Sequence, residues 1–338
     1  MLSVRTTCFL VVPTCLITYI SGAALAQTAI NDVHITPREK AVDVATAAYA
    51  GGATAGFAPA SLIRTSVDLV LVPVTITDDL SRPVLGLGAE NFRLFENKIP
   101  QAIKHFSSED APVSVGLLVD TSGSMEDKLD RAREAVHQFC EAANPHDEFF
   151  MITFADSPRL ATDFTTRPED IENELLTVRP RGQTSLLDAI YMGIRKMRAA
   201  QYARKALLIL SDGGDNHSRY TEHDVRAAVK ESDVLIYAVG TYDSYVRTQE
   251  ELLGPELLSS VTELTGGRSF TVTNLKDLPA VTRVIGTQLR HQYILAYQPP
   301  PGSRNGKWRK ISVKLRLPPK LHSFLHVEAR AGYYSFEK

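Results

Sequence analysis

The feature that most constrains the fold is an apolar run at 113–119, followed at once by the polar turn Asp-Thr-Ser-Gly-Ser-Met at 120–125. The run has the length and composition of a strand buried on both faces. After the turn, apolar residues recur at helical steps of three and four, at Leu129, Ala132, Val136, Phe139 and Ala143. A strand, a turn and a helix in this order predict an α/β fold whose turn lies at the carboxyl end of a parallel strand. Open α/β sheets bind their ligands at that edge.

The polar side chains of this turn indicate a metal site. Asp120, Ser122 and Ser124 offer one carboxylate and two hydroxyls, and oxygen ligands of this kind suit a hard cation such as Mg2+. The alternative is that Ser124 caps the following helix, with Asp127 completing a capping-box spacing. Capping would explain one hydroxyl, but it would leave a buried, unpaired carboxylate at Asp120, which is costly without a cation.

Two later segments give this turn a family context. The stretch 120–124 resembles the D-x-S-x-S signature of the metal-ion-dependent adhesion site in von Willebrand factor type A domains. The stretch 182–189, Gly-Gln-Thr-Ser-Leu-Leu-Asp-Ala, resembles the second loop of that family, and 207–215 resembles its fourth strand and third loop. The three segments follow one another in the order that the family requires, and the resemblance spans 111–291.

The resemblance implies a complete set of metal-binding residues, which are Asp120, Ser122, Ser124, Thr184 and Asp212. In similar domains the two serines bind the metal directly, and the two aspartates usually do so through water. The resemblance further implies a protein ligand that presents Asp or Glu to the metal, with movement of the Thr184 loop or the last helix tuning affinity. We therefore expect an adhesion or interaction module that uses Mg2+, with Mn2+ or Ca2+ as possible substitutes.

An enzyme and a scaffold protein are the two alternatives to this interaction module. A phosphatase with an aspartyl nucleophile needs a second carboxylate where Ser122 stands, and neither G-x-S-x-G nor H-E-x-x-H is present. We therefore expect no enzyme, and a metal-dependent hydrolase is the weakest alternative. A scaffold or assembly protein with a purely structural metal stays open. Asp215 and His217 lie near the third loop but outside the family pattern, and they are predicted to be surface residues.

Strand and helix patterns alternate through 111–291. Strands are predicted at 149–154 and 159–164 (an antiparallel edge pair), 205–210, 234–239 and 266–272. Helices are predicted at 168–178, after Thr184, and at 222–231, 250–265 and 275–289. This alternation predicts a doubly wound, mostly parallel sheet flanked by helices on both faces, a Rossmann-like arrangement.

The segments on either side, 62–110 and 292–338, have β character. We predict that they pair into one small all-β sandwich into which 111–291 is inserted, because each alone is too small for a good core. Pro73 predicts an edge strand or a bulge. Residues 96–98 read as a hairpin turn, followed by a strand at 101–106.

The start of the chain reads as an export signal. Residues 1–26 have a basic start, an apolar stretch and Ala-Leu-Ala before Gln27, and 27–61 is an Ala-, Gly- and Thr-rich flexible linker. We expect a periplasmic or extracellular protein with no transmembrane domain in the mature chain; an uncleaved anchor is the alternative. Cleavage would leave Cys140 as a lone, buried thiol. A net charge of -2 gives no electrostatic case for nucleic acid.

Overall fold

The computed structural model describes residues 69–242, 249–300, 305–318 and 324–335, all within the compact unit Arg64–Lys338. The predicted signal peptide at 1–26 and linker at 27–61 lie outside the described residues. In the part of the chain that the structure describes, no helix is both long and apolar enough to cross a membrane.

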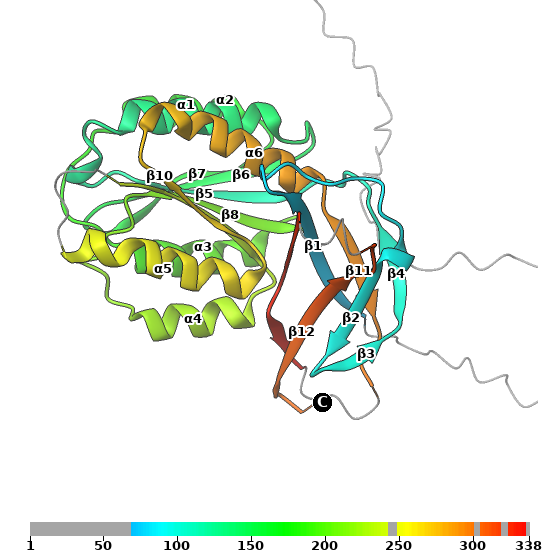
Figure 1. Ribbon diagram of the computed structural model, residues 1–338. Helices are drawn as coiled ribbons and strands as arrows, with labels where there is room; N and C mark the ends of the chain where they lie inside the picture. The colour runs from blue at the N-terminus through cyan, green and yellow to red at the C-terminus, as the bar shows by residue number, and fades with distance from the viewer. Residues whose placement is uncertain (1–68, 243–248, 301–304, 319–323, 336–338) are drawn as a thin grey trace, which may run out of the picture. The chain divides into compact units, whose positions relative to one another are not determined.

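A six-stranded sheet forms the centre of 111–291 and confirms the predicted α/β fold (Figure 1). Its order is β10-β9-β8-β5-β6-β7, and every neighbouring pair is parallel except β6 and β7, which form the expected antiparallel pair at one edge. The strands are β5 Ser114–Asp120, β6 Glu148–Phe154, β7 Pro158–Thr165, β8 Lys205–Ser211, β9 Leu235–Thr241 and β10 Ser269–Val272. All seven residues of β5 are buried, as a strand in the middle of a sheet covered on both faces should be.

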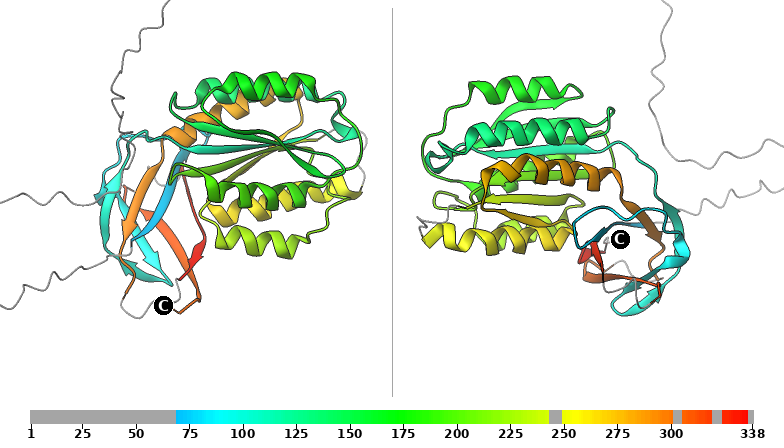
Figure 2. Two further views of the ribbon diagram at one scale, coloured as in Figure 1. Left: turned by 180° about the vertical axis from the view of Figure 1, so that it is seen from behind. Right: turned by 45° about the horizontal axis from the view of Figure 1, so that its top comes forward.

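Helices cover both faces of this sheet, as Figures 1 and 2 show. One face packs against α1 Leu129–Ala142, α2 Pro168–Thr177 and α6 Leu278–Arg290. The other packs against α3 Leu186–Lys196, α4 Glu222–Glu231 and α5 Gln249–Thr265. Cys140 lies on the buried face of α1 as a free cysteine, as expected, and burial raises the pKa of its thiol to about 12.

The flanking segments build two four-stranded antiparallel sheets around a shared core. The first sheet has the order β13-β1-β11-β4, with β1 Val70–Asp78, β4 Ile103–Ser107, β11 Tyr293–Tyr297 and β13 Leu325–Ala329. The second has the order β14-β12-β2-β3, with β2 Phe92–Glu96, β3 Ile99–Gln101, β12 Trp308–Leu315 and β14 Gly332–Tyr334. N-terminal strands therefore pair with C-terminal strands, as predicted. The exact domain boundaries stay a prediction.

Two details of these sheets differ from expectation. β1 is an inner strand, but Pro73 faces Ile294 of β11 at a point where β13, which pairs with 74–78, has not yet begun. The proline therefore lies in the half of β1 that has a neighbouring strand on one side only. There its missing N–H need not cost a hydrogen bond of the sheet. The strand predicted at 101–106 is interrupted at Ala102, because β3 pairs with β2 in one sheet and β4 pairs with β11 in the other.

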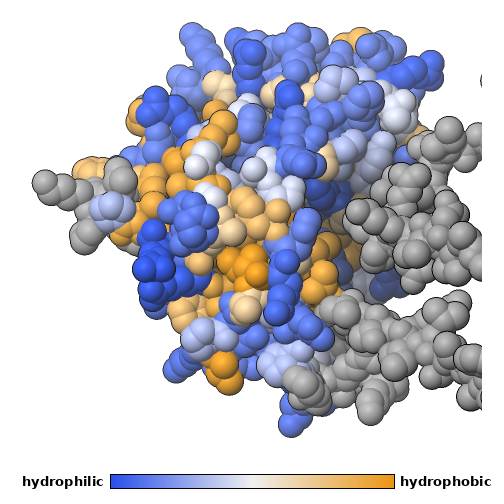
Figure 3. All heavy atoms as spheres, turned by 90° about the vertical axis from the view of Figure 1, so that its right-hand side faces the viewer, coloured by the Kyte–Doolittle hydropathy of each residue, from blue (hydrophilic) through white to orange (hydrophobic). Residues whose placement is uncertain are grey.

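The surface of this β-rich part carries apolar side chains. Figure 3 faces it and shows hydrophobic residues gathered among charged ones. Large exposed apolar residues of its described segments are Leu69, Leu71, Leu80, Leu85, Ile99, Phe324 and Tyr334. Such surface is typical of regions that contact other molecules.

Candidate functional site

The first loop begins with Asp120, the last residue of β5, which is completely buried. Its Oδ1 accepts a hydrogen bond from the Ser122 N–H at 2.9 Å, and its Oδ2 accepts one from the Ser211 hydroxyl at 2.6 Å. Ser211 ends the neighbouring strand β8. The carboxylate is therefore fixed between the ends of two parallel strands.

The two serines of this loop turn their hydroxyls toward each other. The Ser122 and Ser124 Oγ atoms are 3.1 Å apart, on a short 3-10 turn, Gly123–Met125, that is anchored by the fully buried Met125. Neither hydroxyl caps a helix: α1 begins after Lys128 and has no side-chain cap hydrogen bond. The capping alternative for Ser124 is therefore wrong.

The second loop is bonded to the first through its backbone. The Gly123 N–H donates to the Gly182 carbonyl at 3.0 Å, and the Arg181 N–H donates to the Thr121 carbonyl at 2.9 Å. Gly182 has a φ of 82°, and a Cβ there would lie 2.7 Å from the Asp156 carboxylate. A side chain at this position would collide with Asp156, in the turn between β6 and β7, and would be strained by the positive φ.

Thr184 follows in this second loop and is 5% exposed. Its N–H donates to the Asn216 Oδ1 at 2.9 Å, and its carbonyl accepts from the Asn216 and His217 N–H groups, each at 3.0 Å. The structure thus places the Thr184 loop against both other loops. In the described part of the chain, the Thr184 hydroxyl has no hydrogen bond to another candidate ligand.

The third loop supplies Asp212, which directly follows β8 and is 2% exposed. Its Oδ1 accepts a long hydrogen bond from the Gly214 N–H at 3.4 Å. Its Oδ2 is buried and has no hydrogen-bond partner among the described residues; the Lys128 Nζ lies 3.6 Å away. Buried polar atoms are rarely left in this state.

The electrostatics of the site follow from two buried carboxylates close together. Burial, and to a smaller extent the negative charge of Asp212, raise the pKa of Asp120 to about 7. The hydrogen bonds from Ser122 and Ser211 act in the opposite direction. Near neutral pH the pair therefore favours a proton or a metal cation between the loops.

Residues outside the predicted set hold the loops in place. Asp215, expected to be a surface residue, is half-buried, and its Oδ1 accepts from the Leu187 N–H at 3.3 Å and the Ser218 hydroxyl at 2.6 Å. Asp188 accepts from two N–H groups of the third loop at 2.9 and 3.0 Å. These contacts tie the start of α3 to the third loop. Asp215 is thus a partly exposed turn aspartate whose carboxylate accepts hydrogen bonds from its neighbours, as such residues often do.

The donor set fits a hard cation. In the part of the chain that the structure describes, no group of three or more His, Cys, Asp and Glu side chains could hold a metal ion, but the candidate set is two carboxylates with hydroxyls. Adjacent ligands on an octahedral Mg2+ at about 2.1 Å lie about 3.0 Å apart, close to the 3.1 Å between the Ser122 and Ser124 oxygens. The buried Oδ2 of Asp212, which accepts no hydrogen bond from the described residues, is the second feature that fits a bound cation.

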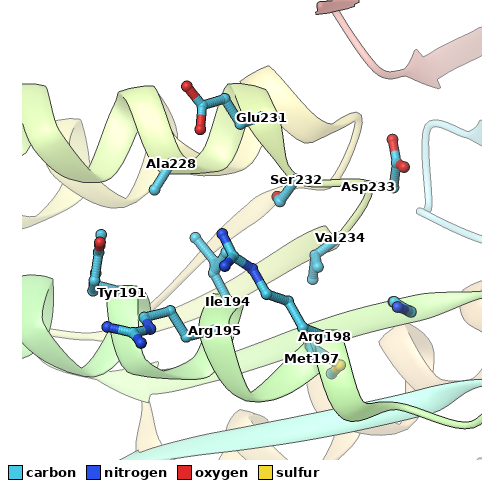
Figure 4. A pocket seen from close by; sticks show the side chains of 11 residues that line it. Tyr191, Ile194, Arg195, Met197, Arg198, Ala228, Glu231, Ser232, Asp233 and Val234 are labelled. Atoms are coloured by element: carbon cyan, nitrogen blue, oxygen red, sulfur yellow. The ribbon is translucent and has the colours of Figure 1, made fainter. Parts of the chain in front are cut away.

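A separate pocket of about 240 Å3 lies between the ends of α3 and α4 (Figure 4). Arg195 comes from α3 and Arg198 from the short 3-10 turn Met197–Ala199 that follows it, while Ser232 and Val234 come from the connection between α4 and β9. Lys205, the first residue of β8, also lines it. The pocket therefore lies at the amino ends of the parallel strands, at the edge of the sheet opposite Asp120.

Comparison with known proteins agrees with this geometry. Residues 115–214 match the family model described as von Willebrand factor type A domain, and this range contains all five candidate residues. That match and the six-stranded sheet show that the chain contains a von Willebrand factor type A domain.

Individual relatives are distant. A UPF0353 protein of Mycolicibacterium paratuberculosis is 23% identical over 60% of this chain and 66% of its own length. Inter-alpha-trypsin inhibitor heavy chain H4 of Bos taurus is 24% identical over 45% of this chain and 18% of its own length. The chain thus spans less than two thirds of both relatives. Among solved structures, von Willebrand factor type A from Catenulispora acidiphila is 12% identical, with a TM-score of 0.47, over 80% of this chain and 74% of that one.

Proposed function

We propose that this protein binds a partner protein through a divalent cation held by Asp120, Ser122, Ser124, Thr184 and Asp212. The observation that carries the proposal is the Oδ2 of Asp212, buried without a hydrogen bond from the described residues, beside a second buried carboxylate. The Lys128 ammonium, 3.6 Å from that oxygen, can balance one of the two carboxylates, so the other still needs a counter-charge. A bound Mg2+ ion would supply that charge together with a coordination position open to a carboxylate from outside.

The residues of the chain have distinct parts in this proposal. Asp120 and Asp212 supply negative charge, and the paired hydroxyls of Ser122 and Ser124 supply neutral oxygen donors. Ser211 orients Asp120 by donating to its Oδ2. The Asn216 side chain holds the backbone of Thr184, so that the hydroxyl-bearing loop stays against the third loop. Mn2+ and Ca2+ also accept oxygen ligands.

The surroundings of the site favour recognition of a protein. Gly123 and Ser124 are exposed, whereas Ser122 and both aspartates are buried, so the site is reached from one side. A Cβ on Gly213 would lie 2.8 Å from the Gly254 Cα, so the first turns of α5 pass close to the third loop. Leu252 and Leu253, both 57% exposed, immediately precede Gly254. We therefore propose that the acidic residue of the partner is flanked by apolar side chains.

A scaffold with a structural cation is the second candidate. The backbone hydrogen bonds between Gly123 and Gly182 and between Thr184 and Asn216 already join the three loops, and a cation could simply complete that assembly. We propose that the protein is not an enzyme, and a broad phosphatase and esterase screen of wild type and Asp120→Ala tests this. We also propose that it is exported, on the strength of the signal-like sequence at 1–26.

The test is a pull-down with the immobilised mature chain, using extracts of the native host in Mg2+ and in EDTA. Asp120→Ala is the loss-of-site variant, and Asp130→Ala, whose side chain is 90% exposed, is the control. The adhesion proposal expects a partner that is retained in Mg2+ by wild type and the control, and lost in EDTA or with Asp120→Ala. A partner retained equally by all three chains in both Mg2+ and EDTA would instead support the scaffold.

A further inference from the structure

A buried lysine lies against the candidate metal site. Lys128 is 4% exposed, and its Nζ is 3.6 Å from the Oδ2 of Asp212. Lysine is almost never buried without a partner. The Asp212 oxygen that Lys128 faces is the one that lacks a hydrogen bond.

The backbone fixes Lys128 in the same turn as the two serines. Its N–H donates to the Met125 carbonyl at 3.0 Å, and its carbonyl accepts from the Ala132 N–H at 3.0 Å. The Met125 N–H in turn donates to the Ser122 carbonyl at 3.1 Å. The ammonium group therefore comes from the first loop, while the carboxylate that it faces comes from the third.

Helix stability does not explain a cation at this position. Lys128 is the residue at the N-terminal cap of α1, and a positive charge there opposes the helix dipole. Ser, Thr, Asp and Asn are the residues that stabilise such a position. Lys128 offers the helix neither a side-chain cap nor a favourable charge, whereas its contact with Asp212 pairs that charge with a buried carboxylate.

The charges of Asp120, Asp212 and Lys128 can be added to compare the site with and without a metal. When both carboxylates are ionised, Asp120, Asp212 and the Lys128 ammonium together carry a charge of about -1, and a dication changes the sum for these groups to about +1. Without Lys128 the same loaded site would be neutral. The lysine thus opposes the metal and favours an anionic side chain from outside.

We propose that Lys128 is an internal counter-cation, a positioning residue that holds Asp212 when no metal is bound and weakens metal binding. This inference rests on the proposed metal site. It explains how two buried carboxylates remain within one folded site in the absence of metal. It also explains why a carboxylate would be attracted once the metal is bound, because the lysine leaves the loaded site positive.

The test removes the charge of Lys128 and keeps its length. Lys128→Met is compared with wild type and with Lys128→Arg, which keeps the charge, in the full mature chain. Lys196→Met is the matched control, because Lys196, at the far end of α3 from the Thr184 loop, pairs with the exposed Asp163 of β7. Mn2+ affinity is measured from the electron paramagnetic resonance signal of free Mn2+, and thermal melts are recorded in EDTA.

Lys128→Met is expected to bind Mn2+ about tenfold more tightly than wild type, while its melting temperature in EDTA falls. Lys128→Arg and Lys196→Met should keep the Mn2+ affinity of wild type within about twofold. Opposite changes in the two measurements separate this role from simple packing, because lost packing would lower stability without strengthening metal binding.

The inference is overturned alone if wild type binds Mn2+ and Lys128→Met binds it equally or more weakly. It is overturned together with the metal site if wild type binds no Mn2+ at millimolar concentration. Circular dichroism checks that the variant folds. If Lys128→Met does not fold in EDTA, Lys128→Gln, which keeps a polar group without the charge, is expected to show the same tightening of Mn2+ binding.

Discussion

Two regions of this molecule each bury a carboxylate, and the two carboxylates differ in the hydrogen bonds that their oxygens accept. In the flanking sheets, Glu96 is 3% exposed and both of its oxygens are used. Its Oε2 accepts hydrogen bonds from the hydroxyls of Tyr297 at 2.7 Å and Tyr333 at 3.0 Å, and its Oε1 accepts one from Arg309 at 2.6 Å. At the edge of the central sheet, Asp212 is 2% exposed, and its Oδ2 accepts no hydrogen bond from the described residues.

The difference separates a structural group from a binding group. A buried charge surrounded by donors of its own chain is complete, and it ties together the strands that supply those donors. Glu96 joins β2 to β11, β12 and β14 in this way. Asp120 and Asp212 are two buried carboxylates close together, and the Lys128 ammonium 3.6 Å from Asp212 can balance only one of them. The pair is therefore incomplete without further positive charge. The comparison predicts that metal will affect one region and leave the other unchanged.

The largest effect is expected from Glu96→Ala. The tyrosine hydroxyls lose their acceptor and a buried ion pair is broken, which typically costs about 3–5 kcal/mol of unfolding free energy. Urea unfolding should show this loss equally in Mg2+ and in EDTA, with the exposed Glu90→Ala close to wild type. A loss that appeared only in EDTA would couple the two regions and break the comparison.

The next effect concerns metal stabilisation at the site. Wild type at 100 times the dissociation constant of Mg2+ should gain about 2.7 kcal/mol relative to EDTA, and Asp120→Ala should lose that gain entirely. Glu96→Ala should keep it. Thermal melts with and without Mg2+ provide the measurement, and an unchanged wild-type melting temperature would count against the site.

Asp212→Asn is expected to have a smaller effect. It keeps the shape of the side chain but removes one charge, and we expect metal affinity to weaken by roughly 10–100-fold. Asp215→Asn, in the same loop but bonded to Leu187 and Ser218, should change affinity by about twofold or less. Isothermal titration with Mn2+ distinguishes the two, and equal losses in both variants would mean that general loop disruption explains them.

The smallest effect is a dependence on pH in EDTA. The pKa of Asp120 is raised from 3.8 to about 7 in the folded chain, so the protonated form favours folding. Its contribution to stability is full below about pH 4 and is lost as pH rises through about 7. The difference in melting temperature between wild type and Asp120→Asn should follow this interval. Stabilisation by Mg2+ should grow over the same interval, because the cation binds the ionised form.

Much of this architecture was predictable from local patterns. The apolar run before Asp120 and the helical spacing after it predicted a buried strand and its helix, and parallel strands bring their carboxyl ends to one edge. That rule is why loops distant in sequence, those of Ser122, Thr184 and Asp212, meet. The roles of these residues as metal ligands come from their oxygen chemistry and from the family resemblance, and they stay predictions.

Other features depend on contacts that no local pattern records. The sequence around Pro73 does not reveal that β13 begins pairing one residue later. A lysine at the start of a helix predicts an exposed side chain, so the burial of Lys128 against the third loop could not be predicted. The break at Ala102 arises because successive strands join different sheets, and the choice of sheet is set by tertiary packing.

The most direct test of the central claim is a crystal structure of the mature chain soaked in millimolar Mn2+, with anomalous data collected at the manganese edge. We predict one strong peak in contact with the Ser122 and Ser124 hydroxyl oxygens, between Asp120 and Asp212, and no peak at Glu96. An anomalous map with no peak among these three loops would contradict the proposed metal site.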